Sequence, residues 1–473
     1  TKDDGGSTGG DGSDSGDGTD GSDGGGYGSD DGTNGGDGSD GSTDEIGWTE
    51  LVPSSDSMIF YVAEIGSDSN DGLSPNRPLR TVAEGVRRLR NGYPDWLLIR
   101  RGDTFNEVLS SNWEKSGRSS DEKMVVGAYG DGPRPVLMTG TSKGLSLYRP
   151  DRRAHLAFTS LEFRPGVPQQ NYGISMVCPN LEDVLFEDLK ITGYSHGIAL
   201  QGEESGQMKD IKIRRTIIAD NAGQSRSQGL FLHRIDGVLV EGCIIDRNGW
   251  DAALGRDATA TIFQHNVYMQ RTVKDAVFRN NFTSRAASHG VQLRLGGIVE
   301  GNVAWANAAG ISFGNEGARS DEPAVQGRIN DNLVLEGVHQ DSTDLRGWGI
   351  QVQHADGVEV MRNVIANSRV GDEHGYGIML FSNRDAYNAN LVIADNVIDD
   401  FGRNIRVDED EVLTVTIRDN LISKSEGSRP LIQHDDGRDV PGLVYQGNRY
   451  IHEAQNGAFK DGTSGLTITE WQA

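Results

Sequence analysis

The chain is 473 residues long, carries a formal net charge of -25 and is 35% hydrophobic, enough for one long repeat domain or for two to three average domains. The acidic balance and the lack of a basic patch argue against nucleic acid as a partner, so an anionic ligand would need a local cationic site. No run of 18 apolar residues occurs, and no membrane span is predicted. The two cysteines, Cys178 and Cys243, imply no disulfide framework and are expected to be free thiols.

Residues 1–45 consist almost entirely of Gly, Ser, Asp and Thr, with 13 acidic residues and one lysine. Such a segment cannot bury enough apolar surface to offset its ordering entropy, and its aspartates repel one another. We therefore predict a disordered linker over 1–45 and one catalytic domain over 46–473. The stretch Asp11–Asp23 has the composition of a calcium loop but no regular ligand spacing, so a spacer is favoured. The missing initial methionine fits a removed targeting segment, and we expect a secreted or cell-surface tethered protein, such as a lipoprotein.

The folded sequence begins near Met58, with strands expected at 59–63 and 97–99 and a polar turn at 66–72. Between the strands, Thr81 and Glu84 have the spacing of a helix capping box. The apolar residues of this helix share one face, namely Val82, Val86 and Leu89. A single amphipathic helix ahead of many strands indicates a cap over the open end of a solenoid.

An internal repeat dominates the rest of the chain. Short β-branched strands recur and end on a small polar residue, often Asn, as in Val299-Glu300-Gly301-Asn302. The equivalent positions are Leu161, Leu189, Thr216, Cys243, Asn281, Asn302, Asn332, Asn363, Asn396, Asn420 and Asn448. Asn tolerates the left-handed backbone of tight turns, and stacked Asn side chains can form hydrogen bonds from coil to coil.

A second strand recurs in the same rhythm, usually after a glycine. It occupies 198–200, 230–232, 267–269, 291–293, 311–313, 350–352, 378–380 and 405–407. One coil is therefore predicted to be a strand, a turn, a second strand and a longer loop. This repeat length and turn chemistry indicate an all-β parallel β-helix solenoid with a short N-terminal capping helix.

The segment Tyr61–Pro75, followed by Pro78-Leu79-Arg80-Thr81-Val82, resembles the entry motif of secreted pectate-lyase-like β-helix proteins. With the Asn-ended coils, the resemblance covers residues 58–455 and implies a right-handed parallel β-helix. That superfamily includes pectate, alginate and glycosaminoglycan lyases, glycosidases, epimerases and phage tailspikes. The resemblance therefore implies a fold and a cellular setting, but not one reaction.

Alternation along the second strand predicts two columns of outward-facing residues up the solenoid. One column contains Ala199, Phe231, Tyr268, Gln292, Ser312, Gln351 and Met379, and another contains Gln201, His233, Gln270, Arg294, Gly314, Gln353 and Phe381. A third, just before the strand, contains His196, Gln228, His265, His289, Ala309, Trp348 and Tyr376. Coils lie about 4.8 Å apart, so groups that titrate or donate hydrogen bonds are expected to converge in the middle of the chain.

The predicted catalytic residues are His265, Tyr268, His289 and Arg294, and this set suits β-elimination from a uronate. A cation near the carboxylate stabilises the developing enolate, a base removes the C5 proton and an acid protonates the leaving oxygen. Arg294 and His289 are assigned to carboxylate neutralisation, with Tyr268 or His265 as base or acid. The predicted substrate-binding residues are His233, Gln270, Gln292, Gln351 and Gln353.

The leading interpretation is a polysaccharide lyase acting on a uronic-acid polymer of the alginate or pectate type, with an acidic polysaccharide as partner and a monomeric state. No metal site is assigned and no cofactor is required. An assisting Ca²⁺ stays open, because Glu316, Asp321 and Glu322 occur in a following loop.

Two alternatives belong to other classes: a glycoside hydrolase using the pairs Asp399-Asp400 or Asp435-Asp436, and a non-catalytic carbohydrate-binding β-helix. Ser288-His289-Gly290 resembles the Gly-His-Gly of polygalacturonases. The Arg-x-Lys expected after it is missing, because Arg294 is followed by Leu295-Gly296.

Overall fold

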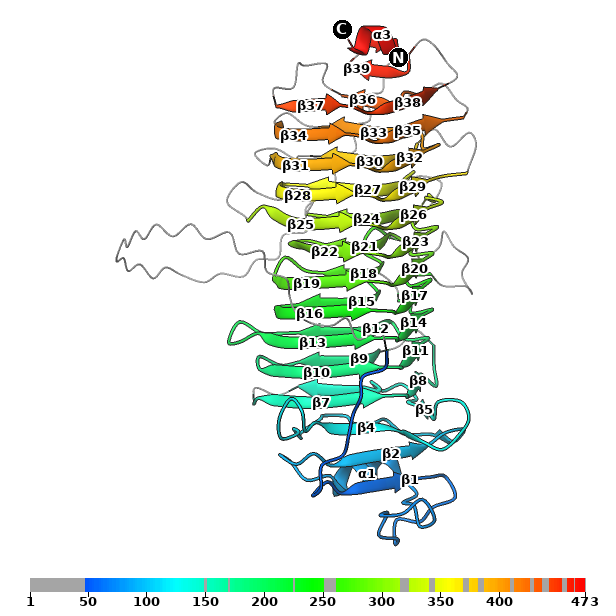
Figure 1. Cartoon of the computed structure of the whole chain (residues 1–473). Coiled ribbons are helices and arrows are strands. Elements are labelled where there is room, and N and C mark those ends of the chain that lie inside the picture. Colours follow the sequence, from blue (N-terminus) through cyan, green and yellow to red (C-terminus); the bar gives the residue numbers. More distant parts are fainter. Residues whose placement is uncertain are drawn as a thin grey trace, which may run out of the picture. The chain divides into compact units, whose positions relative to one another are not determined.

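The computed structural model describes residues 47–472 except 149–150, 169–170, 224–225, 251–260, 315–322, 340–344, 369–373, 382–386, 409–411, 426–428, 436–441, 453–456 and 463. The chain divides into two units, 1–51 and 52–473. In the first unit, the described residues 47–51 form no helix or strand, and the linker predicted over 1–45 lies outside the described residues. The second unit is a right-handed parallel β-helix of about 11 turns (Figure 1).

Three sheets of mostly parallel strands run along this unit, and each coil from β4 to β36 contributes one strand to each sheet. In the described residues, sheet A contains β1 (Ile59–Val62), β2 (Trp96–Arg100), β4 (Met124–Tyr129), β7 (Arg153–Thr159), β10 (Leu181–Glu187), β13 (Met208–Arg214), β16 (Ile235–Glu241), β19 (Val273–Arg279), β22 (Gly296–Glu300), β25 (Val325–Asn330), β28 (Ala355–Met361), β31 (Asn388–Ala394), β34 (Val412–Arg418) and β37 (Leu443–Gln446).

Sheet B contains short strands, namely β3 (Thr104–Phe105), β5 (Val136–Met138), β8 (Glu162–Arg164), β11 (Lys190–Thr192), β14 (Ile217–Ala219), β17 (Ile244–Asp246), β20 (Phe282–Ser284), β23 (Val303–Trp305), β26 (Leu333–Leu335), β29 (Val364–Ala366), β32 (Val397–Asp399), β35 (Leu421–Lys424) and β38 (Arg449–His452). The prediction of two strands per coil was therefore wrong. The predicted turn after each Asn includes a third strand, usually of three residues.

Sheet C contains β6 (Leu145–Tyr148), β9 (Tyr172–Val177), β12 (His196–Gln201), β15 (Gln228–His233), β18 (His265–Met269), β21 (His289–Leu293), β24 (Ala309–Phe313), β27 (Trp348–Gln353), β30 (Tyr376–Phe381), β33 (Arg403–Asp408), β36 (Ile432–His434), β39 (Phe459–Asp461) and β40 (Ser464–Leu466). Eight of these, β12, β15, β18, β21, β24, β27, β30 and β33, are the second strands predicted from the sequence repeat. Only β40 pairs antiparallel among the strands described, and it pairs with β39.

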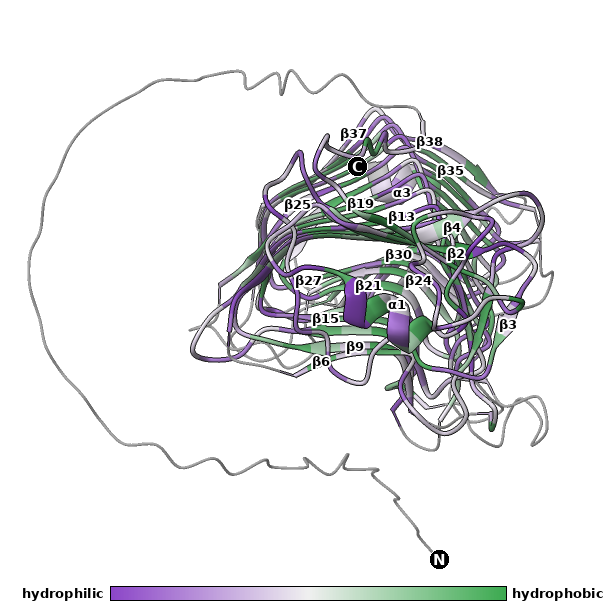
Figure 2. Ribbon diagram, turned by 90° about the horizontal axis from the view of Figure 1, so that it is seen from below, coloured by the Kyte–Doolittle hydropathy of each residue, from purple (hydrophilic) through white to green (hydrophobic). Residues whose placement is uncertain are grey.

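The three sheets surround an apolar interior, seen along the solenoid axis in Figure 2. On sheet C, equivalent aliphatic residues stack from coil to coil and are fully buried, among them Ile198, Leu230, Val267, Val291, Ile350, Ile378 and Ile405. A substitution that shifted one strand by a residue would expose this column, so the stack fixes the register.

Asn side chains join the coils at the corner between sheets A and B, as predicted. Asn302 Nδ2 donates to Asn332 Oδ1 at 2.9 Å, and the same bond recurs at each coil from Asn281 to Asn448. The left-handed backbone conformation of this corner falls on the residue before the Asn, for example Asp331 (φ 60°) and Asp395 (φ 57°). Asn is thereby left to bridge neighbouring coils.

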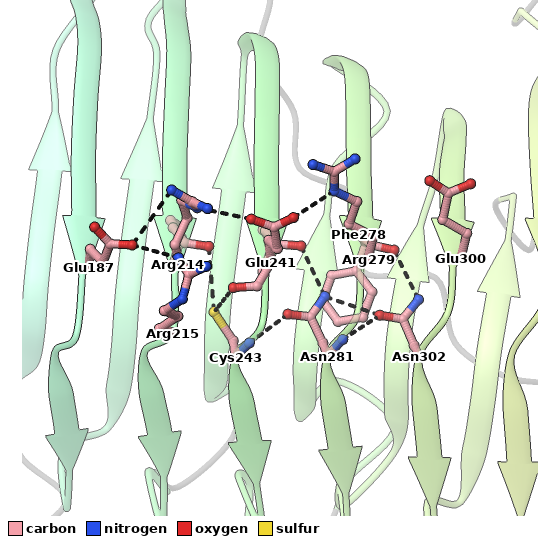
Figure 3. A network of polar contacts seen from close by, with 12 residues as sticks. Glu187, Arg214, Arg215, Glu241, Cys243, Phe278, Arg279, Asn281, Glu300 and Asn302 are labelled. Atoms are coloured by element: carbon pink, nitrogen blue, oxygen red, sulfur yellow. Dashed lines mark hydrogen bonds and ion pairs between the residues drawn. The ribbon is translucent and has the colours of Figure 1, made fainter. Parts of the chain in front are cut away.

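A ladder of alternating charges follows the carboxyl ends of the sheet A strands (Figure 3). Arg214 Nε lies 2.9 Å from Glu241 Oε2, and its Nη1 lies 3.6 Å from Glu187 Oε1. Arg279 Nε lies 2.8 Å from Glu241 Oε1. Each arginine lies between glutamates of adjacent coils, so the spacing of the solenoid pairs opposite charges.

The N-terminal end carries α1 (Val82–Arg88) beside β1 and β2, as predicted for a capping helix. Thr81 is the N-cap and accepts from the Glu84 backbone N at 3.2 Å. The reciprocal half of the capping box is replaced, because the Thr81 backbone N donates to Asp68 at 3.0 Å and Glu84 instead pairs with Arg87 and Arg88. The C-terminal end carries α3 (Ile468–Gln472).

Candidate functional site

The outward columns predicted for the Gly-preceded strands coincide with the register of sheet C. His265 pairs with Gln228, Tyr268 with Gln292, and His289 with Ala309. Arg294 directly follows β21, and Gln270 directly follows β18. The four predicted catalytic side chains therefore come from two adjacent strands of one sheet.

The centre of the site is a contact between two imidazole rings. His265 Nδ1 and His289 Nδ1 are 3.1 Å apart, and the ring centroids are 4.9 Å apart. His289 Nδ1 also lies 3.0 Å from Ser288 Oγ. Both histidines are buried, and both belong to the column just before the strand.

The hydrogen bonds assign the tautomers of this pair. The His289 backbone N donates to His265 Nδ1 at 3.4 Å, so His265 Nδ1 carries a lone pair. The proton shared between the two rings then belongs to His289 Nδ1, which leaves a lone pair on His289 Nε2. We assign His265 as the Nε2–H tautomer and His289 as the Nδ1–H tautomer.

Tyr268 and Arg294 complete the group. The Tyr268 ring centroid lies 4.9 Å from that of His265, and the Arg294 guanidinium carbon lies 4.9 Å from the Tyr268 ring centroid. Burial raises the pKa of Tyr268, while Arg294 and a hydrogen bond with Gln270 act to lower it. Tyr268 is therefore a protonated phenol at neutral pH.

Burial is also the main cause of the histidine pKa shifts. It lowers the pKa of His265 to about 3, with further lowering by Arg294 and Arg346. The pKa of His289 lies well below its ordinary value, first because of burial and then because of His265 and the same two arginines. Both imidazoles are neutral at pH 7, and the positive charge of the site resides on arginine.

Sequence reasoning missed Arg346, which is buried two residues before β27. Its Nη1 donates to Ser288 Oγ at 3.3 Å, and its guanidinium carbon lies 5.0 Å from the Trp348 ring centroid. Arg346 joins the site across 58 residues of sequence and is not part of a periodic strand. Its position next to the Trp348 column was the only sequence signal.

Two of the predicted substrate-binding residues extend the same column. Gln292 is buried, and within the described part of the chain its Oε1 has no hydrogen-bond partner. Gln351 lies two coils further on, where its Oε1 accepts from Ser312 Oγ at 3.1 Å. A buried amide oxygen without a donor is costly, so Gln292 is suited to accept a bond from a bound hydroxyl.

The structure does not bring all the predicted residues together. His233 lies next to Phe231, with ring centroids 6.5 Å apart, on the coil before Tyr268. Gln353 is paired with Phe381 and is buried two coils beyond the coil of Arg294. The two residues lie on the same sheet but on opposite sides of the histidine pair.

The aspartate pairs considered for a hydrolase are already used as hydrogen-bond acceptors. Asp399 accepts from Ser423 Oγ at 2.5 Å, and Asp400 accepts from the backbone N and Oγ of Ser425 at 2.6 and 2.7 Å. Asp435 pairs with Arg406, and Asp436 lies outside the described residues. These contacts give the aspartates a structural role at the corners of the coils.

The loop considered for an assisting Ca²⁺ contains Glu316, Asp321 and Glu322, which lie outside the described residues. Within the described ranges, no cluster of three or more His, Cys, Asp or Glu has the arrangement of a metal site. Within the same ranges, no helix has the length and apolar character needed to cross a membrane.

Comparison with known proteins identifies the architecture. Residues 166–327 match the family described as the right handed beta helix region. The fold is similar to that of the GH136 lacto-N-biosidase from Eubacterium ramulus, with a TM-score of 0.50 and 16% identity over 83% of this chain and 67% of that chain. It is also similar to the periplasmic alginate epimerase AlgG (TM-score 0.49, 10% identity, 78% and 82% coverage) and to pectate lyase Pel9A (TM-score 0.36, 15% identity, 84% and 80% coverage). No curated protein matches the chain in sequence. At these identities the similarity is one of fold.

Proposed function

We propose that this β-helix is a polysaccharide lyase that cleaves a uronic-acid polymer by β-elimination. The observation that carries the proposal is the contact of His265 and His289 beside Tyr268 and Arg294 on adjacent strands of sheet C. The group combines a neutral base, a protonated acid and a fixed positive charge, which are the three functions that the reaction needs.

Arg294 and Arg346 neutralise the substrate carboxylate in this scheme. Both lower the pKa of both histidines, so both guanidinium charges act at the imidazole pair. His289 is not assigned this role, because burial keeps its imidazole uncharged. Withdrawal of charge by the arginines acidifies the C5–H bond of the uronate and stabilises the enolate that forms.

We assign His289 as the base. Its Nε2 carries the lone pair in the tautomer set by the hydrogen bonds, and it accepts the C5 proton. A bound carboxylate brings a negative charge next to the imidazole and offsets the lowering of the pKa by the arginines. The histidine thus becomes a stronger base when the substrate is present.

Tyr268 is assigned as the acid. The electron pair of the C5–H bond forms the double bond between C4 and C5, and the bond from C4 to the glycosidic oxygen breaks. The phenol donates its proton to that leaving oxygen, and solvent restores the starting protonation states. The scheme needs no cofactor, and the acidic chain with its Gly-, Ser- and Asp-rich N-terminal sequence suits a secreted or tethered enzyme.

Turnover of a panel of acidic polysaccharides by four full-length proteins tests the proposal. Tyr268→Phe removes only the hydroxyl, and His289→Ala removes the base. Each is expected to reduce the formation of unsaturated product on the order of a hundredfold or more. Tyr172→Phe is the matched control, because Tyr172 begins β9 on the same sheet and stacks on His196. Near-parent rates for Tyr268→Phe and His289→Ala on a polymer that the parent cleaves would refute the assignment.

A further inference from the structure

A second group of aromatic and basic side chains lies on sheet C, on the coils that follow the histidine pair. Trp348 pairs with Tyr376, and Tyr376 pairs with Arg403, so the three occupy equivalent positions on β27, β30 and β33. The Trp348 and Tyr376 ring centroids are 6.4 Å apart. All three side chains are half-buried.

Guanidinium groups surround the two rings. The Arg403 and Arg406 guanidinium carbons lie 5.5 and 4.9 Å from the Tyr376 ring centroid, and Arg406 Nη1 donates to Tyr376 Oη at 3.0 Å. Arg346 lies over Trp348 and also bonds to Ser288 beside His289. Arg346 therefore connects this group to the histidine site.

Two arginines of β33 belong to this group. Arg406 pairs with Asp435, and Arg403 Nε donates to the amide oxygen of Gln433 at 2.5 Å. Burial lowers the pKa of Arg403, Tyr376 and Asp435 act to raise it, and Arg429 and Arg406 lower it further. A guanidinium group presents several N–H donors in a planar fork, so it suits the carboxylate or sulfate of a ligand as well as these protein acceptors.

An unused hydrogen-bond donor lies in the same place. Trp348 Nε1 is buried and, within the described ranges, has no acceptor. A buried N–H without an acceptor is costly, and an aromatic ring next to it provides an apolar face. The aromatic face, the N–H donor of Trp348 and the neighbouring guanidinium groups together suit a sugar ring that carries hydroxyl and acidic groups.

The group lies at a distance that suits a polymer. Trp348 is two coils beyond His289 and Tyr376 is three, which corresponds to about 10 and 14 Å along the axis at the usual strand spacing. A monosaccharide bound at the histidines would not reach Tyr376, whereas an extended chain would.

We propose that Trp348, Tyr376 and Arg403 form a separate subsite for an acidic sugar residue, carrying a carboxylate or a sulfate, of an extended polysaccharide. As a subsite beside the histidine pair it rests on the proposed function, but ligand binding to it is measured without turnover. The two rings support the sugar, Trp348 Nε1 donates to a ring substituent, and Arg403 binds the acidic group.

Titration calorimetry with the full-length protein in a His289→Ala background tests the subsite. The probes are tetragalacturonate for a carboxylate, a carrageenan tetrasaccharide for a sulfate and maltotetraose as the neutral sugar. At least one acidic probe is expected to bind, with maltotetraose weaker by about tenfold or more, and the tighter acidic probe identifies the acidic group.

Substitutions then locate the binding. Arg403→Gln should weaken the acidic probe by about tenfold and make its affinity less dependent on salt. Trp348→Phe keeps a ring and removes the N–H, so its effect should be smaller than that of Trp348→Ala. Arg449→Gln, which removes an exposed arginine from β38 of sheet B, is the control and should change nothing.

Three results would overturn the subsite. The protein binds neutral and acidic probes with equal affinity, or it binds neither acidic probe, or Arg403→Gln and Trp348→Ala both leave binding unchanged. Failure of the catalytic proposal looks different: the parent would then bind the acidic probe through Arg403 but not cleave the polymer. Cleavage by the parent together with Arg403-independent binding would reject the subsite alone.

Discussion

Replacement of Arg214 by methionine should destabilise the solenoid far more than replacement of an arginine at the exposed end of the same charge ladder. The Arg214, Glu187 and Glu241 side chains are 6%, 4% and 12% exposed, so these charges are held away from water. Loss of one partner of a buried pair typically costs about 3 to 5 kcal/mol.

The lower end of that range is expected here. Glu187 retains Arg215 at 2.7 Å and Glu241 retains Arg279 at 2.8 Å, so neither carboxylate is left alone. The matched control is Arg328→Met, because Arg328 pairs with Glu300 in the same ladder but is 43% exposed. That substitution should cost at most about 1 kcal/mol.

Urea unfolding of both variants, followed by far-ultraviolet circular dichroism, gives the comparison as a shift in midpoint. Because a repeat protein can unfold in stages, the midpoints are compared over the same transition. The double variant Arg214→Met with Glu241→Gln should recover part of the loss, since it removes one of the two carboxylates that Arg214 contacts. Equal shifts for Arg214→Met and Arg328→Met would refute the argument from burial.

Three further predictions follow from the same structure. Asn363→Ala removes the acceptor of the Asn332 backbone N–H and two bonds that Asn363 donates, so it should lower the free energy of unfolding in urea by about 2 to 4 kcal/mol. An effect below about 1 kcal/mol would contradict the stabilising role of the stacked Asn side chains. The pKa of His265 falls to about 3 in the folded protein, so its contribution to stability should be complete above about pH 6.5. Toward pH 3 the free energy of unfolding should decline by up to about 1.4 kcal/mol per pH unit. His265→Asn should make this decline less steep, and an equal slope would count against burial of the neutral ring. With a neutral His289 and a protonated Tyr268 in the free protein, kcat/KM should be flat across neutral pH, and a steep dependence there would contradict their roles.

The sequence was sufficient to predict the coils because two local signals recur along the chain. An Asn stands at the corner of seven successive coils from Asn281 to Asn448, and a glycine precedes six of the eight predicted sheet C strands. The repeat of these positions sets the register that places Tyr268 beside Gln292. The strands of sheet B gave no comparable signal. A three-residue strand such as Phe282–Ser284 is too short to show alternation.

The site was predictable only in part, for a physical reason. The sequence repeat places His289 in the column just before the strand, but it does not show that Arg346 contacts Ser288 beside it, because that contact spans 58 residues. The burial that keeps the imidazoles neutral is therefore invisible in the sequence. Arg403 was overlooked for a simpler reason: the columns were followed only as far as Tyr376, one coil short of it.

The most direct test of β-elimination uses water enriched in heavy oxygen. The protein cleaves its preferred acidic polymer in this water, and mass spectrometry identifies the products. Elimination breaks the bond between C4 and the glycosidic oxygen without adding water. The new non-reducing end should therefore be an unsaturated uronate, lighter than a saturated one by one water, and the early products should carry no solvent oxygen. Saturated products with solvent oxygen at the new reducing end would show hydrolysis and contradict the account.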